Sequence, residues 1–322
     1  MKAVLGIDTS CYTTSTALVS SDGKLISSAR KLLSVEEGGR GLQQSAAMFQ
    51  HIKAIPRMIE EVLLHAEAIE IAAVAASTRP RPAEDSYMPV FRAGESEART
   101  AAMLLGVPFF PVTHQQGHIR AAMYQTDLKT DQPFLALHLS GGTTELLACN
   151  QNVLSLLGGT LDLHAGQLID RIGVSMGLPF PAGPEMEKLA AAGTAMGRIG
   201  VTIRGLNCCI SGAENKAAAW LSSNELKRQD IAAEVFDFLS RTIERLLEQA
   251  VSETGYHNAL LAGGVASSLL FRKMLQQRAA KRGLNCNLFF AKPELSGDNA
   301  VGVALLGADY LKGETYHDSN QD

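Results

Sequence analysis

The 322-residue chain contains few cysteines, and they follow no recognisable pattern. Disulfide frameworks and cysteine zinc sites both need paired or regularly spaced cysteines. Here the count is odd, the spacing is scattered and no Cys-x-x-Cys pair occurs. The sequence therefore predicts neither a disulfide-stabilised fold nor a cysteine metal site. The five positions are Cys11, Cys149, Cys208, Cys209 and Cys286.

Long apolar runs and an excess of one charge are also missing. No apolar run reaches the roughly 18 residues of a membrane span, and the N-terminus enters a strand without a secretory apolar region. A hydrophobic fraction of 46% with 19% charged residues is typical of a globular chain. A net charge of −4 is unfavourable for holding nucleic acid alone. We expect a soluble, cytoplasmic protein that contacts RNA through a local patch or a partner.

A histidine pair is the first feature that points to chemistry. His114 and His118 stand four apart, directly after the apolar run 106–112, which predicts a buried strand. In a helix, residues at that spacing lie one above the other on one face. Two such imidazoles can hold one metal ion. On spacing alone, two ordinary polar histidines on a half-buried helix are as good an interpretation.

The chain repeats a unit of three strands. Residues 3–10, 15–19 and 25–29 read as strands, with a hydroxyl-rich connection between the first two. The same order of strand, small polar tip, strand, turn and strand returns about 130 residues later, at 134–157. An internal duplication of this kind is typical of the actin-like (ASKHA) architecture. We therefore predict an α/β, duplicated ribonuclease-H-like two-lobe fold.

Polar tips and glycine turns supply further candidates. The hydroxyls of Thr9, Ser10 and Thr13 could meet an anion, or could form an ordinary polar hairpin tip. Gly263-Gly264 follow an apolar strand and open a helix, where backbone can approach a ligand. Asp298 stands just before a helical pattern at 300–311, where N-capping is its alternative role. Helices are also expected over 42–68, 93–105, 114–124, 213–221, 231–254 and 269–281.

Taken together and in order, these pieces resemble the TsaD/Gcp/Kae-type family of tRNA threonylcarbamoyl transferases, whose old name is O-sialoglycoprotein endopeptidase. The resemblance covers nearly the whole chain. The matching motifs are Gly6-Ile7-Asp8-Thr9-Ser10-Cys11, His114-Gln115-Gln116-Gly117-His118, Ser140-Gly141-Gly142, Ala165-Gly166-Gln167-Leu168-Ile169-Asp170, Pro181-Ala182-Gly183-Pro184, Ser211-Gly212, Ala262-Gly263-Gly264-Val265 and Asp298-Asn299.

The resemblance implies an enzyme with one metal ion, iron or zinc, held by His114, His118 and Asp298. It implies transfer of a threonylcarbamoyl group from its adenylate to N6 of adenosine 37 in tRNA, or a closely related carbamoyl transfer. No catalytic side chain is assigned. The nucleotide or substrate pocket would be lined by Leu139, Ser140, Gly141, Gly142, Thr143, Asp170, Gly183, Gly263, Gly264 and Ser268.

Several positions depart from the family pattern. Tyr12 and Thr13 replace an Asp-Glu pair, and Thr143 replaces a histidine at the second tip. Residues 79–82 read Arg-Pro-Arg-Pro where a glycine-rich loop is expected, and Ser268 stands where asparagine is frequent. The ligand set is intact while the substrate-handling set has changed. A non-catalytic nucleotide-binding paralogue that acts as a partner scaffold is therefore the alternative function.

The expected lobes follow from the duplication and the resemblance. The first lobe spans 1–108 and is completed by the helix 298–313, the second spans 109–297 with inserted helices, and 314–322 is a polar tail. The resemblance further implies that tRNA is bound within a complex, with a second actin-like subunit and a small ATPase as candidate partners. No membrane partner is expected.

Overall fold

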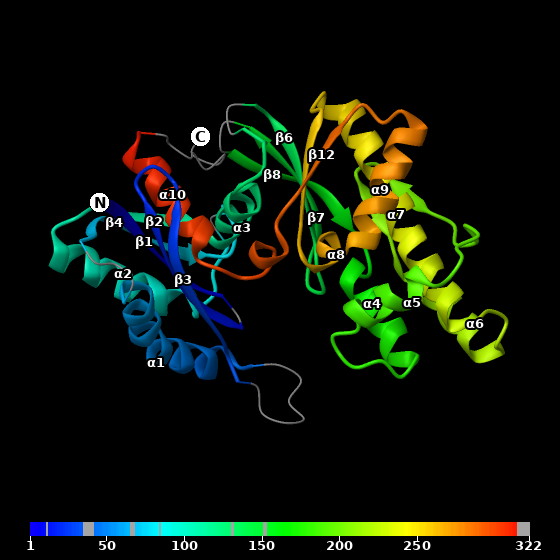
Figure 1. Cartoon of the computed structure of the whole chain (residues 1–322), viewed down its shortest axis with the longest axis horizontal. Helices are drawn as coiled ribbons and strands as arrows, with labels where there is room; N and C mark the ends of the chain where they lie inside the picture. The colour runs from blue at the N-terminus through cyan, green and yellow to red at the C-terminus, as the bar shows by residue number, and fades with distance from the viewer. Residues whose placement is uncertain are drawn as a thin grey trace. The chain divides into compact units, whose positions relative to one another are not determined.

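The computed structural model describes residues 1–10, 12–34, 42–64, 68–83, 85–129, 132–150 and 153–313 (Figure 1). The expected polar tail at 314–322 and Cys11 lie outside the described residues. The chain divides into two compact units. The first comprises Met1–Tyr124, Asn152–Leu154 and Glu294–Asp322, and the second Gln125–Gln151 and Ser155–Pro293.

The first unit is built on a five-stranded sheet with the order β3-β2-β1-β4-β5. The two parallel pairs join β1 to β4 and β4 to β5, and β2 pairs antiparallel with both β1 and β3. Its strands are β1 (Lys2–Thr9), β2 (Thr13–Ser20), β3 (Leu25–Leu32), β4 (Glu70–Arg79) and β5 (Phe109–Thr113). Its helices are α1 (Gln44–Leu63), α2 (Phe91–Leu105), α3 (His114–Met123) and α10 (Val301–Leu311).

Alternation along β1 assigns the two faces of this sheet. Successive strand residues point to opposite faces. Ala3, Leu5 and Ile7 belong to the apolar cluster formed with α1 and α2, whereas Val4 belongs to the cluster formed with α10. Gly6 also faces α10, where an added Cβ would meet the backbone nitrogen of Ala304 at 2.6 Å. Even-numbered residues of β1 therefore face α10, and the next in that series is Asp8.

The second unit repeats the same plan within a seven-stranded sheet, β12-β11-β6-β7-β8-β10-β9. The strands are β6 (Phe134–Leu139), β7 (Thr144–Asn150), β8 (Val153–Thr160), β9 (Thr202–Arg204), β10 (Asn207–Cys209), β11 (Asn258–Ala262) and β12 (Asn287–Phe290). Strands 8-7-6-11-12 repeat 3-2-1-4-5 of the first unit, with parallel pairs β6–β11 and β11–β12. This order confirms the predicted duplicated two-lobe α/β fold.

The helices of the second unit are α4 (Ala165–Ser175), α5 (Gly183–Ala191), α6 (Ser211–Ser223), α7 (Arg228–Thr254), α8 (Gly264–Ser267) and α9 (Leu269–Arg282). A short 3-10 turn, η1, spans Pro293–Leu295. The long helix α7 carries the centre of one large apolar cluster, with Phe236, Phe238 and Leu239 almost fully buried. Residues of α4, α5 and α8 belong to the same cluster, so these three helices pack together with α7.

Some element boundaries differ from the expected ones. The helix expected over 42–68 spans Gln44–Leu63 and continues through Pro56. Residues 193–212, for which irregular or extended structure is expected, contain the short strands β9 and β10. The expected lobe boundary after residue 108 also differs from the observed division. Residues 109–124 lie in the first unit because β5 pairs with β4 and α3 packs against α10.

No helix within the described residues is both long enough and apolar enough to cross a lipid bilayer.

Candidate functional site

The start of α3 is fixed by a capping box. The Thr113 hydroxyl accepts a hydrogen bond from the backbone N–H of Gln116 at 3.2 Å, and the Gln116 side chain accepts one from the Thr113 N–H at 2.8 Å. Reciprocal bonds of this kind satisfy backbone donors that a helix leaves unpaired at its first turn. The helix therefore begins at His114, which places His118 one turn later on the same face.

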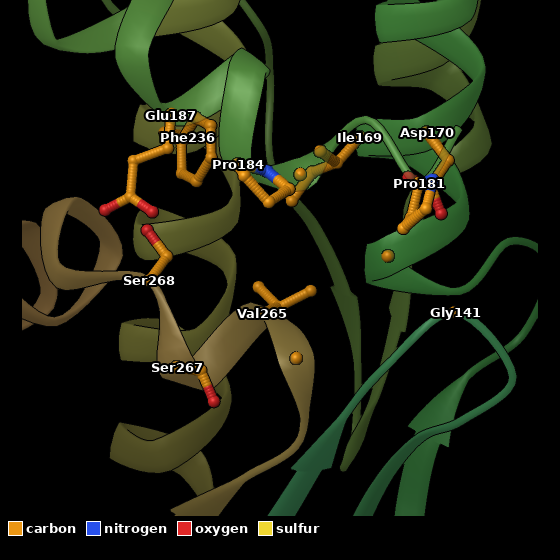
Figure 2. A pocket seen from close by; sticks show the side chains of 13 residues that line it. Gly141, Ile169, Asp170, Pro181, Pro184, Glu187, Phe236, Val265, Ser267 and Ser268 are labelled. Atoms are coloured by element: carbon orange, nitrogen blue, oxygen red, sulfur yellow. The ribbon is translucent and has the colours of Figure 1, made fainter. Parts of the chain in front are cut away.

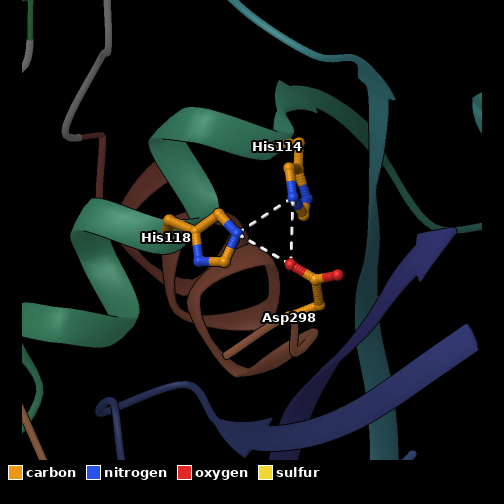
Figure 3. A group of neighbouring side chains, drawn as sticks. All are labelled: His114, His118 and Asp298. Atoms are coloured by element: carbon orange, nitrogen blue, oxygen red, sulfur yellow. Dashed lines mark hydrogen bonds and ion pairs between the residues drawn. The ribbon is translucent and has the colours of Figure 1, made fainter. Parts of the chain in front are cut away.

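His114, His118 and Asp298 point toward one another (Figure 3). One ligand atom from each lies within 4.8 Å of the others. His118 Nε2 is 2.9 Å from His114 Nε2 and 3.1 Å from Asp298 Oδ1, and His114 Nε2 is 3.5 Å from the same oxygen. Two imidazoles and one carboxylate form a donor set that zinc and iron accept, with coordination positions left open.

Asp298 does not cap the helix that follows it. The helix α10 begins at Val301, its N-cap residue is Ala300, and no side chain of that residue caps it. The N–H of Val301 donates instead to the Asn299 side chain at 3.0 Å. Asp298 is free to turn toward α3, so the capping role considered from the sequence is not observed.

A close backbone contact brings together the segments that carry the two histidines and Asp298. A Cβ added at Gly302 would lie 1.8 Å from the carbonyl oxygen of Gly117, and one added at Gly117 would meet the Val303 side chain at 3.1 Å. Only glycine at 302 permits this approach. Because Gly117 lies between the two histidines and Gly302 follows Asp298 closely, this contact joins two segments that are far apart in the sequence. His118 and Asp298 are separated by 180 residues.

Two further residues hold His114 and Asp298 from outside the cluster. Asp8 Oδ1 lies 2.9 Å from His114 Nδ1, and Asp8 also accepts a hydrogen bond from the Ser77 hydroxyl. The Ser10 hydroxyl donates to Asp298 Oδ2 at 2.8 Å. The ring of Phe91 packs against the His114 ring with 5.7 Å between centroids.

The electrostatics of this cluster favour a cation. Burial alone would lower the pKa of His114, but the carboxylates of Asp8 and Asp298 raise it well above its usual value. Burial acts to raise the pKa of Asp298, yet hydrogen bonds from His114 and His118 lower it well below its usual range. In the described part of the chain, neither Asp8 nor Asp298 forms an ion pair with lysine or arginine. A positive charge between the imidazoles would therefore stabilise the ionised carboxylates of Asp8 and Asp298.

The second unit contains a pocket of about 430 Å³ (Figure 2). It is formed by the tip after β6, the start of α4, the start of α5, and the turn that contains α8. The side chains of Phe236 and Ile169 supply apolar wall, and Asp170, Glu187 and Ser268 supply polar groups. The full lining is Gly141, Gly166, Ile169, Asp170, Pro181, Gly183, Pro184, Glu187, Phe236, Gly264, Val265, Ser267 and Ser268.

Five of the predicted pocket residues lie in this lining, namely Gly141, Asp170, Gly183, Gly264 and Ser268. The other five support it or lie beside it. Leu139 is fully buried in β6, and the Ser140 hydroxyl accepts hydrogen bonds from the N–H groups of Gly142 and Thr143. Gly263 has φ +96°, and a Cβ there would lie 2.4 Å from the Leu139 carbonyl oxygen.

Hydrogen bonds hold the polar residues of the pocket in place. Asp170 Oδ1 accepts from the N–H of Ala182 at 2.8 Å. The Ser268 hydroxyl caps α9 by accepting from Phe271 N–H at 3.1 Å, and Glu187 Oε1 accepts from Leu270 N–H at 2.8 Å. A Cβ at Gly166 would lie 2.6 Å from the nitrogen of Gly141, so glycine lets the tip and α4 touch. The pocket is thus bounded by constrained backbone.

The hydroxyls of the first hairpin have partners within the protein. Thr9 donates to the carbonyl of Val90 at 2.9 Å, and Ser10 donates to Asp298. Thr13 is buried. These three were candidates for anion contact, and two of them bond to the protein's own groups.

Sequence reasoning did not single out Asp8, Ser77, Glu187 or Phe236. Asp8 lies in the first matching motif, but a lone acidic residue at the end of a strand has no spacing pattern that assigns it a role. Glu187 follows Gly183 by four residues at the start of α5, so helical spacing could have placed both toward the pocket. Phe236 is one of many apolar residues of α7, and periodicity does not distinguish a pocket wall from core.

Comparison with known proteins shows the family. Residues 29–305 match the family model described as TsaD, tRNA N6-adenosine threonylcarbamoyltransferase. The chain belongs to this TsaD family. A curated TsaD relative, the tRNA N6-adenosine threonylcarbamoyltransferase of Methanopyrus kandleri, is 30% identical over 308 residues, which cover 94% of this chain and 86% of the relative.

Solved structures show the same fold at low identity. The crystal structure of HypF from T. kodakarensis matches with a TM-score of 0.66 and 15% identity over 98% of this chain. The chain spans about half of that protein, 49% of its length. A ROK hexokinase from Thermus thermophilus matches with a TM-score of 0.56 and 15% identity, over 97% of this chain and 99% of the hexokinase. TsaD membership and these neighbours agree on an actin-like fold.

Proposed function

We propose that the chain is a transferase that moves a threonylcarbamoyl group from its adenylate to N6 of adenosine 37 in tRNA. Membership of the TsaD family supports a transferase that acts in tRNA modification. The observation that supports this specific reaction is the convergence of three potential ligand atoms within 4.8 Å of one another, from two segments that are 180 residues apart.

One divalent metal ion, iron or zinc, would be held by His114, His118 and Asp298. The donor set fits such an ion, since two neutral imidazoles and one carboxylate are the chemistry that zinc and iron prefer. The buried carboxylate of Asp8 and the half-buried carboxylate of Asp298 also lack a lysine or arginine ion pair among the described residues. When bound, the metal supplies Lewis-acid polarisation of an oxygen of the substrate.

The pocket of the second unit would hold the adenylate. The Ser140–Thr143 tip offers constrained backbone near glycine, which permits close approach of a phosphate. Phe236 and Ile169 offer apolar surface for a base, while Asp170, Glu187 and Ser268 offer polar groups for the remainder. These groups position the substrate, which lowers the entropic part of the barrier.

In the transfer itself, the N6 amine forms a bond to the carbamoyl carbon. The bond between that carbon and the phosphate oxygen of the adenylate breaks, AMP leaves, and the amine loses a proton. The chain's contribution is to hold the adenylate in one orientation and to exclude other orientations of it. No side chain is assigned as general base.

Partners follow from charge and from the family. A net charge of −4 is poor for holding tRNA alone. We therefore propose that tRNA is bound in a cytoplasmic complex, with a second actin-like subunit and a small ATPase as partners.

A second candidate is a nucleotide-binding paralogue without catalysis, which serves as a scaffold for a catalytic relative. The replaced positions favour it, because Tyr12, Thr13 and Thr143 stand where the family pattern has acidic residues and a histidine. Such a protein would keep the pocket and the fold but would not modify tRNA.

Complementation decides between the two. The chain is expressed in cells that lack their own threonylcarbamoyl transferase, with the partner subunits present, and tRNA nucleosides are measured by mass spectrometry. The transferase proposal predicts that the modified nucleoside returns with the wild-type chain and not with the His114→Ala/His118→Ala variant. Soluble wild-type protein that restores no modified nucleoside would overturn the transfer proposal and favour the scaffold.

A further inference from the structure

The end of β1 presents two polar side chains to the same face of the first sheet. Residues two apart on a strand point to the same side. Asp8 and Ser10 therefore continue the series of Val4 and Gly6, which faces α10. Thr9 points to the opposite face, where its hydroxyl contacts the carbonyl of Val90 and the N–H of Gly94. The end of β1 and the residue that follows it thus face the cluster with an acidic group and a hydroxyl.

Each of these two side chains holds a different member of the cluster. Asp8 is fully buried and its Oδ1 lies 2.9 Å from His114 Nδ1. Ser10 is 3% exposed and its hydroxyl donates to Asp298 Oδ2 at 2.8 Å. His114 Nε2 and Asp298 Oδ1 are the atoms left to face His118. Both contacts therefore select which atom of a ligand residue points inward.

We propose that Asp8 and Ser10 are positioning residues of the metal centre. Asp8 accepts the Nδ1–H of His114 and so fixes the tautomer that presents an unprotonated Nε2. Ser10 holds one carboxylate oxygen of Asp298 and so directs the other toward the imidazoles. This inference rests on the metal site of the proposed function. It assigns a role to two residues that contact no metal ion themselves.

The positioning role of Asp8 depends on its negative charge as well as on its ability to accept a hydrogen bond from His114. A neutral amide could also accept the Nδ1–H of His114. A carboxylate buried without full compensation is costly, and Asp8 Oδ2 is buried with no hydrogen-bond partner among the described groups. The Ser77 hydroxyl bonds to the other oxygen, the one that faces His114. A negative charge at this place increases the basicity of the imidazole, which strengthens its bond to a cation.

Cobalt binding to the full chain tests the proposal. Co²⁺ is titrated into metal-free wild-type protein, Asp8→Asn, Ser10→Ala and the ligand variant His114→Ala, with the visible absorption spectrum as readout. Outer partners of ligating histidines typically contribute about 10- to 100-fold in metal affinity. We expect a loss of about tenfold or more for Asp8→Asn, a smaller loss for Ser10→Ala, and no ligand-field spectrum for His114→Ala.

A control separates this effect from general destabilisation. Glu95 is a largely buried carboxylate of the same unit that pairs with Arg92 and Arg99. Glu95→Gln removes a buried charge without touching the cluster, so cobalt affinity should equal that of the wild type. Circular dichroism of each metal-free variant reports whether it is folded.

A second readout follows the tautomer directly. Nitrogen-15 shifts of the imidazoles in the zinc-bound wild type should report His114 with hydrogen on Nδ1, and the Nδ1–H signal should shift or broaden in Asp8→Asn. If Asp8→Asn binds cobalt as tightly as wild type with the same spectrum, the positioning role is wrong and the metal site stands. If wild type itself binds no cobalt, the metal site of the proposed function is wrong. If Asp8→Asn does not fold, Ser10→Ala and Ser77→Ala provide the same comparison.

Discussion

The two units share one strand order, and they differ in what stands at the end of the first strand. In the first unit, Asp8 near the end of β1 and Ser10 just after it hold His114 and Asp298. In the second unit the equivalent strand β6 is followed by Ser140, whose hydroxyl accepts hydrogen bonds from the backbone of its own glycine tip. One unit exposes ionisable side chains to its site, and the other presents constrained backbone and glycine.

This difference teaches that a duplicated scaffold can separate two chemical tasks. Buried carboxylates and imidazoles favour a cation. Glycine-lined backbone allows the close approach that a nucleotide phosphate needs. Under the proposed function, the first unit provides the metal centre and the second provides the adenylate pocket. The same strand positions thus carry different chemistry after duplication.

Removing two ligands should give the largest effect and test the division of tasks. The His114→Ala/His118→Ala variant keeps only one of three donors, so metal content should fall by more than about 100-fold, beyond the loss caused by an outer partner. Metal is measured by mass spectrometry of protein purified without chelator. Binding of AMP, measured by calorimetry, should persist. Loss of AMP binding in a folded variant would contradict the separation of the two sites.

Gly263→Ala should destabilise the second unit. Gly263 has φ +96° and ψ 170°, a region that is essentially restricted to glycine. An added Cβ would also lie 2.4 Å from the Leu139 carbonyl oxygen. Forcing another residue into that region costs about 1 to 3 kcal/mol, measured as the free energy of unfolding in urea. An unchanged unfolding midpoint would show that the tip and the turn are not in the contact described.

The neighbouring substitution Gly264→Ala is the matched control for Gly263→Ala, because it adds the same methyl group at the adjacent glycine. An added Cβ at Gly264 meets no atom within 4 Å, so the unfolding free energy should be unchanged. Gly264 nevertheless lines the pocket, and a methyl group there should weaken AMP binding by about tenfold, or about 1.4 kcal/mol. Calorimetric titration with AMP measures it. Equal AMP affinity would remove this wall from the proposed nucleotide site.

The smallest effect is expected at Asp162, which acts on structure alone. Burial acts to raise its pKa, but hydrogen bonds from the Ser211 hydroxyl and from the N–H groups of Ile210 and Leu163 lower it overall. These bonds place a carboxylate at the start of α6, whose own N-cap residue is Ile210.

Because the folded-state pKa of Asp162 lies below the ordinary 3.8, its stabilisation is present above that value and is lost as pH falls through the folded pKa. Asp162→Asn should therefore lower the thermal unfolding temperature at about pH 7, and the gap to wild type should narrow at about pH 3. A gap that is constant with pH would mean that the carboxylate charge does not matter.

Much of the fold was predictable because its signals are local and repeated. The two copies of a strand, polar tip and strand could be read from period-2 runs and turn residues. The capping box at Thr113 and Gln116 likewise places the start of α3. The lobe boundary was harder, because the pairing of β5 with β4 joins segments about 35 residues apart, as Val74 and Phe109 do.

The site was predictable in part. Spacing alone joins His114 to His118, and only the family resemblance adds Asp298, since no periodicity links residues 180 apart. Asp8 could not be identified, because its role depends on the strand face toward α10, which the tertiary packing of Val4 and Gly6 reveals. Glu187 had a helical spacing signal from Gly183, but its contact with Leu270 is a tertiary fact.

The contact between Gly302 and Gly117 has a consequence for how metal affinity can be adjusted. The backbones of α3 and α10 can approach each other here because Gly302 has no Cβ. A Cβ at this position would lie 1.8 Å from the Gly117 carbonyl oxygen. The separation between the histidines and Asp298 is thus set by a missing methyl group, outside the donor set. Replacing Gly302 with alanine, serine and valine in turn would act as a graded spacer. Under the proposed function, metal affinity would fall stepwise with side-chain size while every donor atom stayed in the chain.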